Sequence, residues 1–287
     1  MNGATPIIRN LTQEEIHTIP IAWASAEGWN PGLTDHASFL AADPAGFWGL
    51  FLDDEPVACL SAVRYEPGFA FLGFYIVRPE YRGQRFGRML WDYALQSLQG
   101  RVIGLDGVLA QEANYTRCGF RRAYRSIRFE GKTRATGTTF PIDHGLRRIG
   151  LAELAAVEAY DAPLFPAARG TFLRAWLAQP GTEGFAVYEG TQLHGFGVIR
   201  PCLRGWKIGP LFADAPTTAA RLFTQLTAGL PAGSTFYLDV PEANPAALAL
   251  AQAHSLQRVF ETVRMYKGPA PALPLHRIFG NTSFELG

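Results

Sequence analysis

The 287-residue chain has the length of two ordinary domains, and 48% of its residues are hydrophobic while 18% are charged. This composition supplies a substantial core and excludes an intrinsically disordered chain. Lysine and arginine (26) nearly balance aspartate and glutamate (25), which leaves a formal net charge of +1. Because binding to phosphate-rich surfaces rests on clustered cationic charge, we expect neither nucleic acid nor an acidic membrane as a partner.

The sequence has no segment that predicts membrane insertion, export or a metal site. The longest apolar stretch, residues 69–77, is far shorter than the roughly 20 residues that a membrane helix needs. Residues 1–11 do not combine a basic segment with an apolar run, so we expect a cytoplasmic protein. The three cysteines lie far apart and no CxxC or HExxH pattern occurs, so we expect neither disulfides nor a bound metal.

Strands and helices are predicted in alternation along the first half of the chain. A short strand at residues 7–10 precedes Thr12-x-x-Glu15, a capping box that starts a helix. The remaining patterns predict strands at residues 48–52, 57–64, 69–77 and 102–105, helices at about 86–98 and 111–117, and a final hairpin at 121–129. The apolar stripe of the longer helix consists of Phe86, Leu90, Tyr93 and Ala94. Together these signals predict a mixed α/β (α+β) domain with a largely antiparallel sheet flanked by helices.

The second half repeats the first at an offset of 136 residues, as from Arg122 to Arg258. Residues 122–129 match residues 258–265 in their arginine, aromatic and β-branched positions, and Arg64 matches Arg200, each at the end of a predicted strand. A period this long indicates a duplicated domain, since solenoid units have only roughly 20–50 residues.

The seam between the two copies is predicted at residues 131–139, which are polar and punctuated by glycine as linkers are. We therefore predict an N-terminal domain at residues 1–134 and a C-terminal domain at residues 140–287.

One segment, residues 69–90, combines an apolar strand, a basic loop and a helix. The strand ends at Val77, Pro79 stops it, and the loop at residues 82–87 (Arg-Gly-Gln-Arg-Phe-Gly) leads directly into the helix. Glycines let the backbone come close to a ligand, and unpaired N–H groups at a helix start point toward negative charge. The loop therefore indicates a ligand that carries phosphate; the alternative is a basic strand-to-helix turn without a ligand.

This segment resembles the V-x-P-x-x-R-G-x-G-x-G/A signature of the GNAT superfamily of acetyl-CoA-dependent N-acetyltransferases. Val77, Pro79, Arg82, Gly83 and Gly87 match the signature, whereas Arg85 replaces one of its glycines. The resemblance implies acetyl-CoA as co-substrate, with its pyrophosphate on the loop and its pantetheine and thioester on backbone groups of the preceding strand. The donor-binding residues that it implies are Ile76, Val77, Arg82, Gly83, Gln84, Arg85, Phe86, Gly87 and Arg88.

A second element of the same family follows downstream. Residues 114–120 (Asn-Tyr-Thr-Arg-Cys-Gly-Phe) resemble the helix end L/F-Y-x-x-x-G-F of GNAT domains. The matched tyrosine often protonates the departing thiolate of coenzyme A, so the resemblance implies Tyr115 as general acid; a phenol, with a pKa of about 10, suits that task. The alternative is an ordinary core tyrosine. An asparagine that the family often has seven residues before this tyrosine is Val108 here.

The second half lacks both elements. Its equivalent loop, residues 213–218, contains no glycine, and Ala251 and Ser255 stand where the first half has Tyr115 and Gly119. The chain as a whole resembles a tandem-GNAT subgroup with a degenerate C-terminal domain, which we expect to shape the acceptor site or to act as a structural partner.

The acceptor site is predicted around Trp23, Glu27, Trp29 and Asn30, in a region that commonly lines the acceptor pocket of GNAT enzymes. Two tryptophans around a carboxylate can hold an amine by cation–π and charge contacts. The alternative for these residues is packing, with a solvated glutamate.

The predicted function is direct transfer of an acetyl group to the amine of a small-molecule or peptide acceptor, without a covalent enzyme intermediate. Residues 160–165 and Arg169 are candidates to close the pocket from the second half, since ligand sites favour domain interfaces. The general base stays open between Glu27, Glu66 and water, and the sequence defines neither the acceptor nor the oligomeric state. The alternatives are a non-catalytic acyl-CoA-binding or sensor protein and a transferase of aminoacyl or longer acyl groups.

Overall fold

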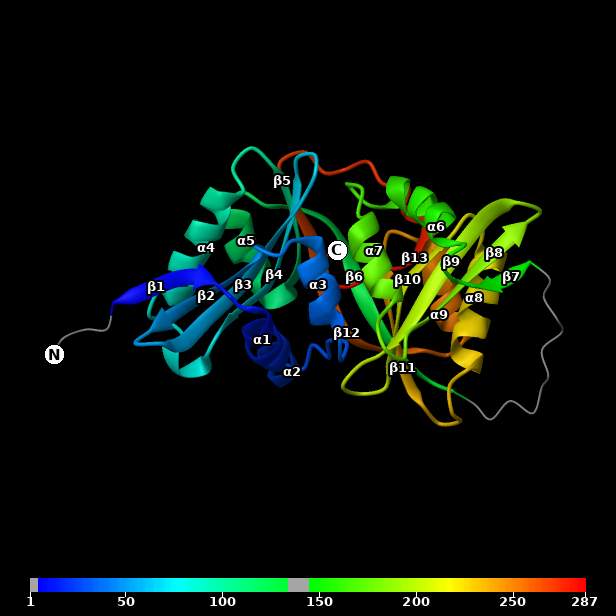
Figure 1. The fold of residues 1–287 in the computed structure, drawn as a ribbon, viewed down its shortest axis with the longest axis horizontal. Helices are drawn as coiled ribbons and strands as arrows, with labels where there is room; N and C mark the ends of the chain where they lie inside the picture. The colour runs from blue at the N-terminus through cyan, green and yellow to red at the C-terminus, as the bar shows by residue number, and fades with distance from the viewer. Residues whose placement is uncertain (1–4, 134–144) are drawn as a thin grey trace.

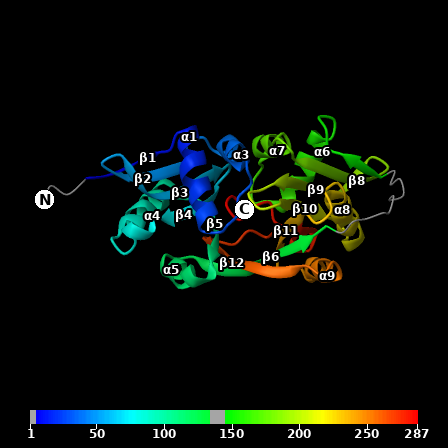
Figure 2. The same cartoon turned by 90° about the horizontal axis from the view of Figure 1, so that it is seen from below.

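A computed structural model describes residues 5–133 and 145–287 of the chain. The described residues form one 13-stranded sheet with helices on both of its faces (Figures 1 and 2). The predicted mixed α/β architecture with a mostly antiparallel sheet is confirmed. Of the predicted linker, Gly131 and Lys132 end a strand, while residues 134–139 lie outside the described residues.

In the described residues the two halves follow the same order of strands and helices, except that three α-helices follow the first strand of the first half and two follow the first strand of the second. The first half consists of β1 Pro6–Asn10, α1 Gln13–Ile16, α2 Ala22–Ala26, α3 Asp35–Ala42, β2 Phe47–Leu52, β3 Glu55–Tyr65, β4 Phe69–Val77, α4 Phe86–Ser97, β5 Val102–Val108, α5 Glu112–Arg117 and β6 Arg121–Lys132. The second consists of β7 Leu146–Arg148, α6 Leu154–Asp161, α7 Gly170–Leu177, β8 Glu183–Glu189, β9 Gln192–Pro201, β10 Trp206–Ala213, α8 Pro216–Ala228, β11 Thr235–Pro241, α9 Pro245–Ala253 and β12 Gln257–Lys267, followed by a short extra strand, β13 Ile278–Gly280. The division at residues 134 and 140 stays a prediction.

Local sequence signals explain several of these elements. Thr12 and Glu15 form the predicted capping box at the start of α1. In α4, Leu90, Trp91 and Ala94 are buried, whereas the ring of Tyr93, predicted in the apolar stripe, is 38% exposed at the edge of the interface. The stripe therefore follows a face that includes Trp91 in place of Tyr93.

The last strand of each half pairs with the other half. The order of the sheet is β1-β2-β3-β4-β5-β12-β6-β11-β10-β9-β8-β7. Strand β12 of the second half lies antiparallel between β5 and β6, and β6 of the first half lies antiparallel between β12 and β11. Figure 1 shows β6 and β12 at the centre of the molecule, between the two sets of helices. The predicted hairpin at residues 121–129 is wrong: this segment is one long strand, because its neighbours in the sheet come from the second half.

Two equivalent buried ion pairs accompany this exchange of strands. Arg264 of β12 donates to Asp106 of β5 at 2.6 and 2.9 Å, and Arg128 of β6 donates to Asp239 of β11 at 2.7 and 2.8 Å. All four side chains are at most 4% exposed. Each pair therefore joins the last strand of one half (β12 or β6) to the fifth strand of the other half (β5 or β11).

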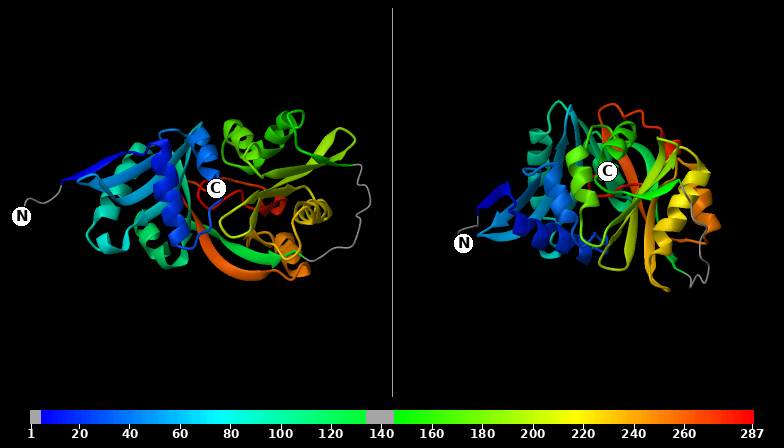
Figure 3. Two further views of the ribbon diagram at one scale, coloured as in Figure 1. Left: turned by 60° about the horizontal axis from the view of Figure 1, so that its bottom comes forward. Right: turned by 45° about the vertical axis from the view of Figure 1, so that its right-hand side comes forward.

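Hydrophobic packing joins the halves a second time. One cluster contains residues of both halves, including Phe39 of α3 and Trp176 of α7, whose ring centroids lie 6.2 Å apart. Arg200 of β9, at the predicted repeat position of Arg64, is fully buried and ion-paired with Asp35 of α3 at 2.8 Å. On the opposite face, α4 covers the strands of the first half, while α8 and α9 cover those of the second. Figure 3 shows the chain ending in the middle of this assembly, between the halves.

The exchanged ion pairs predict a stability effect. Asp239→Asn should lower the free energy of unfolding by about 3–5 kcal/mol, because it leaves the buried guanidinium of Arg128 without its countercharge. Although burial opposes ionisation, Arg128 holds the pKa of Asp239 below its usual value. This contribution is therefore present above the unfolded-state pKa of about 3.9 and is lost as the pH falls through the lower folded value.

Urea unfolding at neutral pH measures this effect. The matched control is Asp92→Asn, which removes the carboxylate of an exposed ion pair with Arg88 on α4 and should change the midpoint little. Equal urea midpoints for the two variants would contradict the stabilisation that we assign to the buried pair of Arg128 and Asp239.

Candidate active site

A pocket opens where two parallel strands separate. Residues Phe69–Leu72 of β4 pair with Val102–Leu105 of β5, and beyond these residues the two strands diverge. A cavity of about 410 Å³ lies in the opening, lined on one side by residues 72–77 of β4 and on the other by Leu105, Asp106 and Val108. The divergence of the strands thus exposes backbone and side chains of the middle of the sheet to a ligand.

A β-bulge shapes the wall of this pocket. Phe74 has a φ of 47°, a conformation that non-glycine residues rarely adopt, and the pairing of β3 with β4 shifts register at this point. Phe74 lines the pocket, and the carbonyl of this bulged residue accepts a hydrogen bond from the thiol of Cys59 at 3.3 Å. The neighbouring Gly73 is required by a close approach, since a Cβ atom there would lie 2.1 Å from the carbonyl oxygen of Glu285. A glycine within an apolar strand was the one sequence signal of this bulge.

The predicted loop, residues 82–87, connects this pocket to the start of α4. Gly83 and Arg85 both have positive φ (78° and 70°), which explains why the family signature has glycine at each position. Within the described residues, the backbone N–H groups of Gly83, Gln84 and Arg85 have no protein acceptor, and no side chain caps α4. The guanidinium of Arg85 is exposed and has no partner in the described part of the chain. Free N–H groups at a helix start form a site for an anion.

The other donor-binding candidates lie around this loop. Ile76, Val77 and Arg82 line the pocket, whereas Gly83, Gln84, Arg85, Phe86, Gly87 and Arg88 lie outside its lining, along the loop and the first turn of α4. Arg82 donates to the carbonyl of Val77 at 2.9 Å and to the carboxylate of Glu27 at 2.5 Å, so it fixes the loop to the end of β4 and to α2. A Cβ atom at Gly87 would lie 2.7 Å from the side chains of Tyr75 and Val77. Glycine at this position therefore lets α4 pack closely against β4.

Tyr115 lies in the wall of the same pocket. Its helix, α5, ends as the sequence motif requires: Gly119 has a φ of 88°, and the N–H of Phe120 donates to the carbonyl of Tyr115 at 3.1 Å. The ring packs against Trp91 and directly over Gly107, where a Cβ atom would lie 2.4 Å from it. Burial raises the pKa of Tyr115, so its hydroxyl keeps its proton at neutral pH.

The structure brings two of the four predicted acceptor residues to the pocket. Glu27 and Trp29 line it, while Trp23 packs against the shared hydrophobic cluster. Asn30 has a φ of 54° and points into the second half, where it accepts from the N–H of Arg204 at 2.9 Å and donates to Cys202 at 3.2 Å. The two halves are thus held together next to the pocket by Asn30.

The second half reaches the pocket through segments that sequence reasoning missed. Phe260 and Thr262 of β12, together with Phe284 and Glu285 of the C-terminal tail, line the cavity. The predicted candidates of the second half lie elsewhere: Arg169 forms a buried ion pair with Asp161, at 2.8 Å, behind that tail. Likewise Glu66, weighed as a base, is exposed and paired with Arg101 outside the pocket lining. No local signal predicts these contacts, because they depend on strand pairing over more than 150 residues of sequence.

The equivalent opening in the second half is filled. Residues Trp206–Ile208 of β10 pair with Phe236–Leu238 of β11. Beyond them, β13 pairs with β10 in the space between the two strands. The N–H of Asn281 donates to the carbonyl of Asp239 at 2.7 Å. The neighbouring loop carries Asp214, whose carboxylate accepts from Tyr160 at 2.7 Å and pairs with Arg277 at 2.8 Å. The chain's own C-terminal segment therefore occupies the place that corresponds to the pocket.

The described residues offer neither a metal-binding cluster nor a membrane-spanning helix. They contain no group of three or more His, Cys, Asp or Glu side chains that could hold a metal ion. None of their helices combines the length and the hydropathy needed to cross a membrane.

Comparisons with known proteins identify the family. The Acetyltransferase (GNAT) family model matches residues 9–120, and the Acetyltransferase (GNAT) domain model matches residues 157–280. A holothin acyltransferase of Pseudoalteromonas sp. (strain SANK 73390) is 31% identical over 265 residues, which cover 92% of this chain and 89% of the relative. The chain belongs to the GNAT acetyltransferase family. It is a GNAT acyltransferase with two tandem GNAT domains, as the sequence motifs predicted.

Solved structures share the tandem GNAT fold. A putative acetyltransferase from Pyrococcus horikoshii has a TM-score of 0.81 at 24% identity, over 100% of this chain and 97% of that one. A tandem GNAT protein from the clavulanic acid biosynthesis pathway has a TM-score of 0.65 at 14% identity, over 93% and 100% of the two chains. In both cases the likeness spans nearly the whole chain, so the arrangement of two GNAT domains is common to these proteins.

Proposed function

We propose that this GNAT acyltransferase transfers the acetyl group of acetyl-CoA to the amine of a small molecule, by direct transfer in the pocket of the first half. One observation carries the proposal: the loop with its unpaired N–H groups adjoins, at Arg82, the opening between β4 and β5, and Tyr115 lines that same opening with its phenol. The N–H groups of the loop suit a pyrophosphate, and the opening suits an extended pantetheine arm. The phenol of Tyr115 suits protonation of a leaving thiolate.

The residues of the loop fit the donor. The N–H groups of residues 83–88 and the positive end of the α4 dipole would bind the pyrophosphate, and the free guanidinium of Arg85 would pair with a phosphate. Backbone groups of Ile76 and Val77 would hold the pantetheine arm. The bulge at Phe74 brings the backbone of β4 to the pocket wall, where an N–H group could stabilise charge on the thioester carbonyl oxygen.

The acceptor side favours a small molecule. The relative at 31% identity is named for acyl transfer to holothin, and the likeness covers nearly all of both chains. We therefore propose a small amine as acceptor and holothin as the first compound to test. Because acetyl-CoA is a cytoplasmic metabolite, we place the reaction in the cytoplasm.

The proposal predicts amine-dependent release of coenzyme A. Purified protein incubated with acetyl-CoA and a panel of amines that includes holothin should release free thiol, detected with a thiol reagent, and form an acetylated product, detected by mass spectrometry. Binding of acetyl-CoA without thiol release for any amine would instead support an acyl-CoA-binding protein. A strong preference for a longer acyl-CoA would reassign the donor.

Tyr115→Phe should lower kcat by roughly 10²–10⁴-fold, since it removes the proton donor for the thiolate. The dissociation constant of acetyl-CoA should barely change, because the hydroxyl faces the reacting end and the ring keeps its packing on Trp91 and Gly107. Single-turnover kinetics make the measurement independent of product release. An unchanged rate of the chemical step would leave Tyr115 a core residue.

One acetyl-CoA should bind per chain, because β13 fills the opening of the second half and Pro216 at the start of α8 has no N–H to offer. Isothermal titration should give a stoichiometry near one. Gly83→Val should abolish binding, because valine strains the positive φ of the loop and shifts its N–H groups.

Gly233→Val is the matched control for this titration. Gly233 has the same φ of 78° and open space for a Cβ, but it lies in the second half, away from the pocket. The Gly233→Val variant should bind acetyl-CoA normally. A stoichiometry of two in the unmodified protein would contradict the assignment of a single site to the first half.

A further inference from the structure

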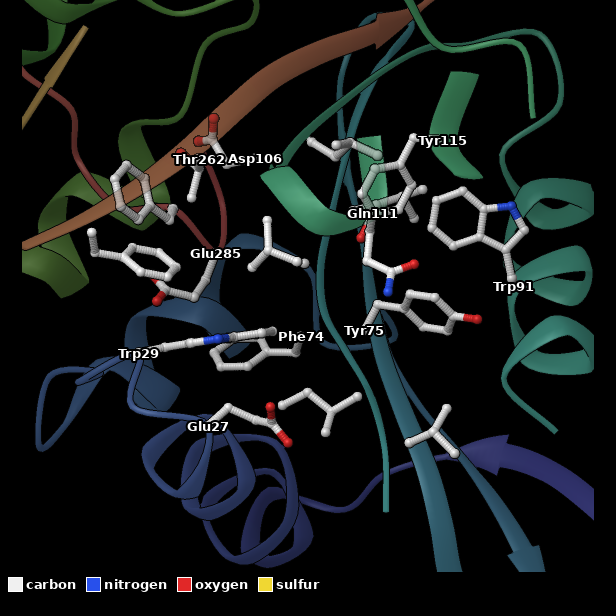
Figure 4. A pocket seen from close by; sticks show the side chains of 18 of the residues that line it. Glu27, Trp29, Phe74, Tyr75, Trp91, Asp106, Gln111, Tyr115, Thr262 and Glu285 are labelled. Carbon is white, nitrogen blue, oxygen red and sulfur yellow. The ribbon is translucent and has the colours of Figure 1, made fainter. Parts of the chain in front are cut away.

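The pocket contains one buried carboxylate that the protein does not pair. Glu285 belongs to the C-terminal tail, residues 281–287, all of which are buried. Its side chain is 3% exposed and lines the pocket, and its Oε2 atom has no hydrogen-bond partner in the described residues. Figure 4 shows Glu285 and Trp29 on the side of the pocket opposite Tyr115 and Trp91. A buried carboxylate without a donor is costly, so its position calls for a ligand that supplies one.

The other carboxylates of the pocket already have partners. Glu27 accepts from Arg82 at 2.5 Å, and Asp106 accepts two hydrogen bonds from Arg264. Among the residues that line the pocket, Glu285 is therefore the carboxylate left for a substrate.

The cations near Glu285 are engaged elsewhere. Arg128 and Lys207 are close enough to act on it electrostatically. Arg128 donates to both oxygens of Asp239 and to the carbonyl of Trp29, and Lys207 donates to the carbonyl of Asn30 at 2.8 Å. Their hydrogen bonds thus go to Asp239 and to backbone carbonyls, and none is donated to Glu285.

Aromatic rings line the same pocket as this carboxylate. They belong to Trp29, Phe74, Phe260 and Phe284. Flat apolar rings offer stacking to a planar molecule and cation–π attraction to an ammonium group. A substrate carboxylate would meet Glu285 and no free cation, so this end of the pocket disfavours it.

We propose that Glu285 binds the ammonium group of the acceptor and removes its proton, and that the acceptor is a primary alkylamine that carries an aromatic or heteroaromatic ring and no carboxylate. This inference rests on the proposed acetyl transfer. It assigns to the C-terminal tail of the second half a catalytic residue for the reaction in the first.

In this step an acceptor R–NH₃⁺ gives one proton to Glu285, and the nitrogen lone pair attacks the carbonyl carbon of the thioester. The C–N bond forms and the C–S bond breaks, with its electron pair on sulfur. Sulfur takes a proton from Tyr115, and the amide nitrogen gives its second proton to the tyrosine oxygen. Glu285 then releases its proton to solvent, so one ammonium ion and one acetyl-CoA become one amide, one thiol and one proton.

The test compares Glu285→Gln with the unmodified protein in steady-state kinetics. The amide keeps the size of the side chain but cannot take the proton, so kcat/KM for the amine should fall by roughly 10²–10³-fold. The dissociation constant of acetyl-CoA should stay within about twofold, because the tail lies away from the donor loop. Glu285→Asp should restore part of the rate, which a purely structural role would not require.

Two control variants isolate the effect. Thr282→Val removes a hydroxyl that accepts from Arg169 at 2.9 Å in the same buried tail, so it should lower Tm without changing kcat/KM at a temperature where it is folded. Glu27→Gln removes the other accessible carboxylate. If Glu27→Gln loses the rate and Glu285→Gln keeps it, the proposal is overturned.

The proposed class of acceptor is tested by comparing the acetylation rates of two probes, 2-phenylethylamine and phenylalanine, which differ by one carboxylate. The unmodified protein should prefer the amine, and Glu285→Gln should reduce that preference by about tenfold or more, because the like-charge repulsion is lost. Equal use of both probes by the unmodified protein, or acetylation of other amines only, would overturn the class. Acetyl-CoA turnover with no amine at all would instead refute the proposed function itself.

Discussion

The exchange of the last strands, fixed by two buried ion pairs, determines the rest of this structure. Arg128 and Arg264 occupy equivalent positions in the duplicated sequence, and each reaches the fifth strand of the opposite half. An arginine buried in a sheet is tolerated only with a bidentate partner, so the pairing specifies which strands are neighbours. Once β12 lies beside β5, the sheet runs without interruption through both halves.

The two copies have diverged around the same structural opening. In the first half the separation of β4 from β5 leaves a pocket, and in the second the separation of β10 from β11 holds β13. The tail that follows β13 then passes through the middle of the molecule and contributes Phe284 and Glu285 to the pocket. The second half is therefore more than a scaffold, since its last residues complete the site of the first.

Much of this could be predicted from the sequence because its causes are local. Three features depend on residues within a few positions of one another: the capping box at Thr12, the apolar run of β4 and the glycine pattern of the loop. The duplication is visible as a direct repeat of residue types along the chain. The position of Arg85 in the left-handed region follows from the glycine that it replaces. What could not be predicted depends on long-range pairing: the single strand β6 in place of a hairpin, the bulge at Phe74, and Glu285 in the pocket. Asn30 illustrates the limit, because its positive φ turns it away from Trp29, its neighbour in sequence.

The position of β12 in the sheet also sets the order of events during synthesis. A chain leaves the ribosome from its N-terminus, and domains generally fold as they emerge. Here the N-terminal GNAT domain cannot complete its sheet beside β5 until residues 257–267 have been made, and its pocket gains its last wall only with the final residues of the chain. Until then β5 has an open edge, of the kind that pairs with other chains. In the interval between the synthesis of β5 and of β12, this edge of β5 is therefore open to pairing with another chain.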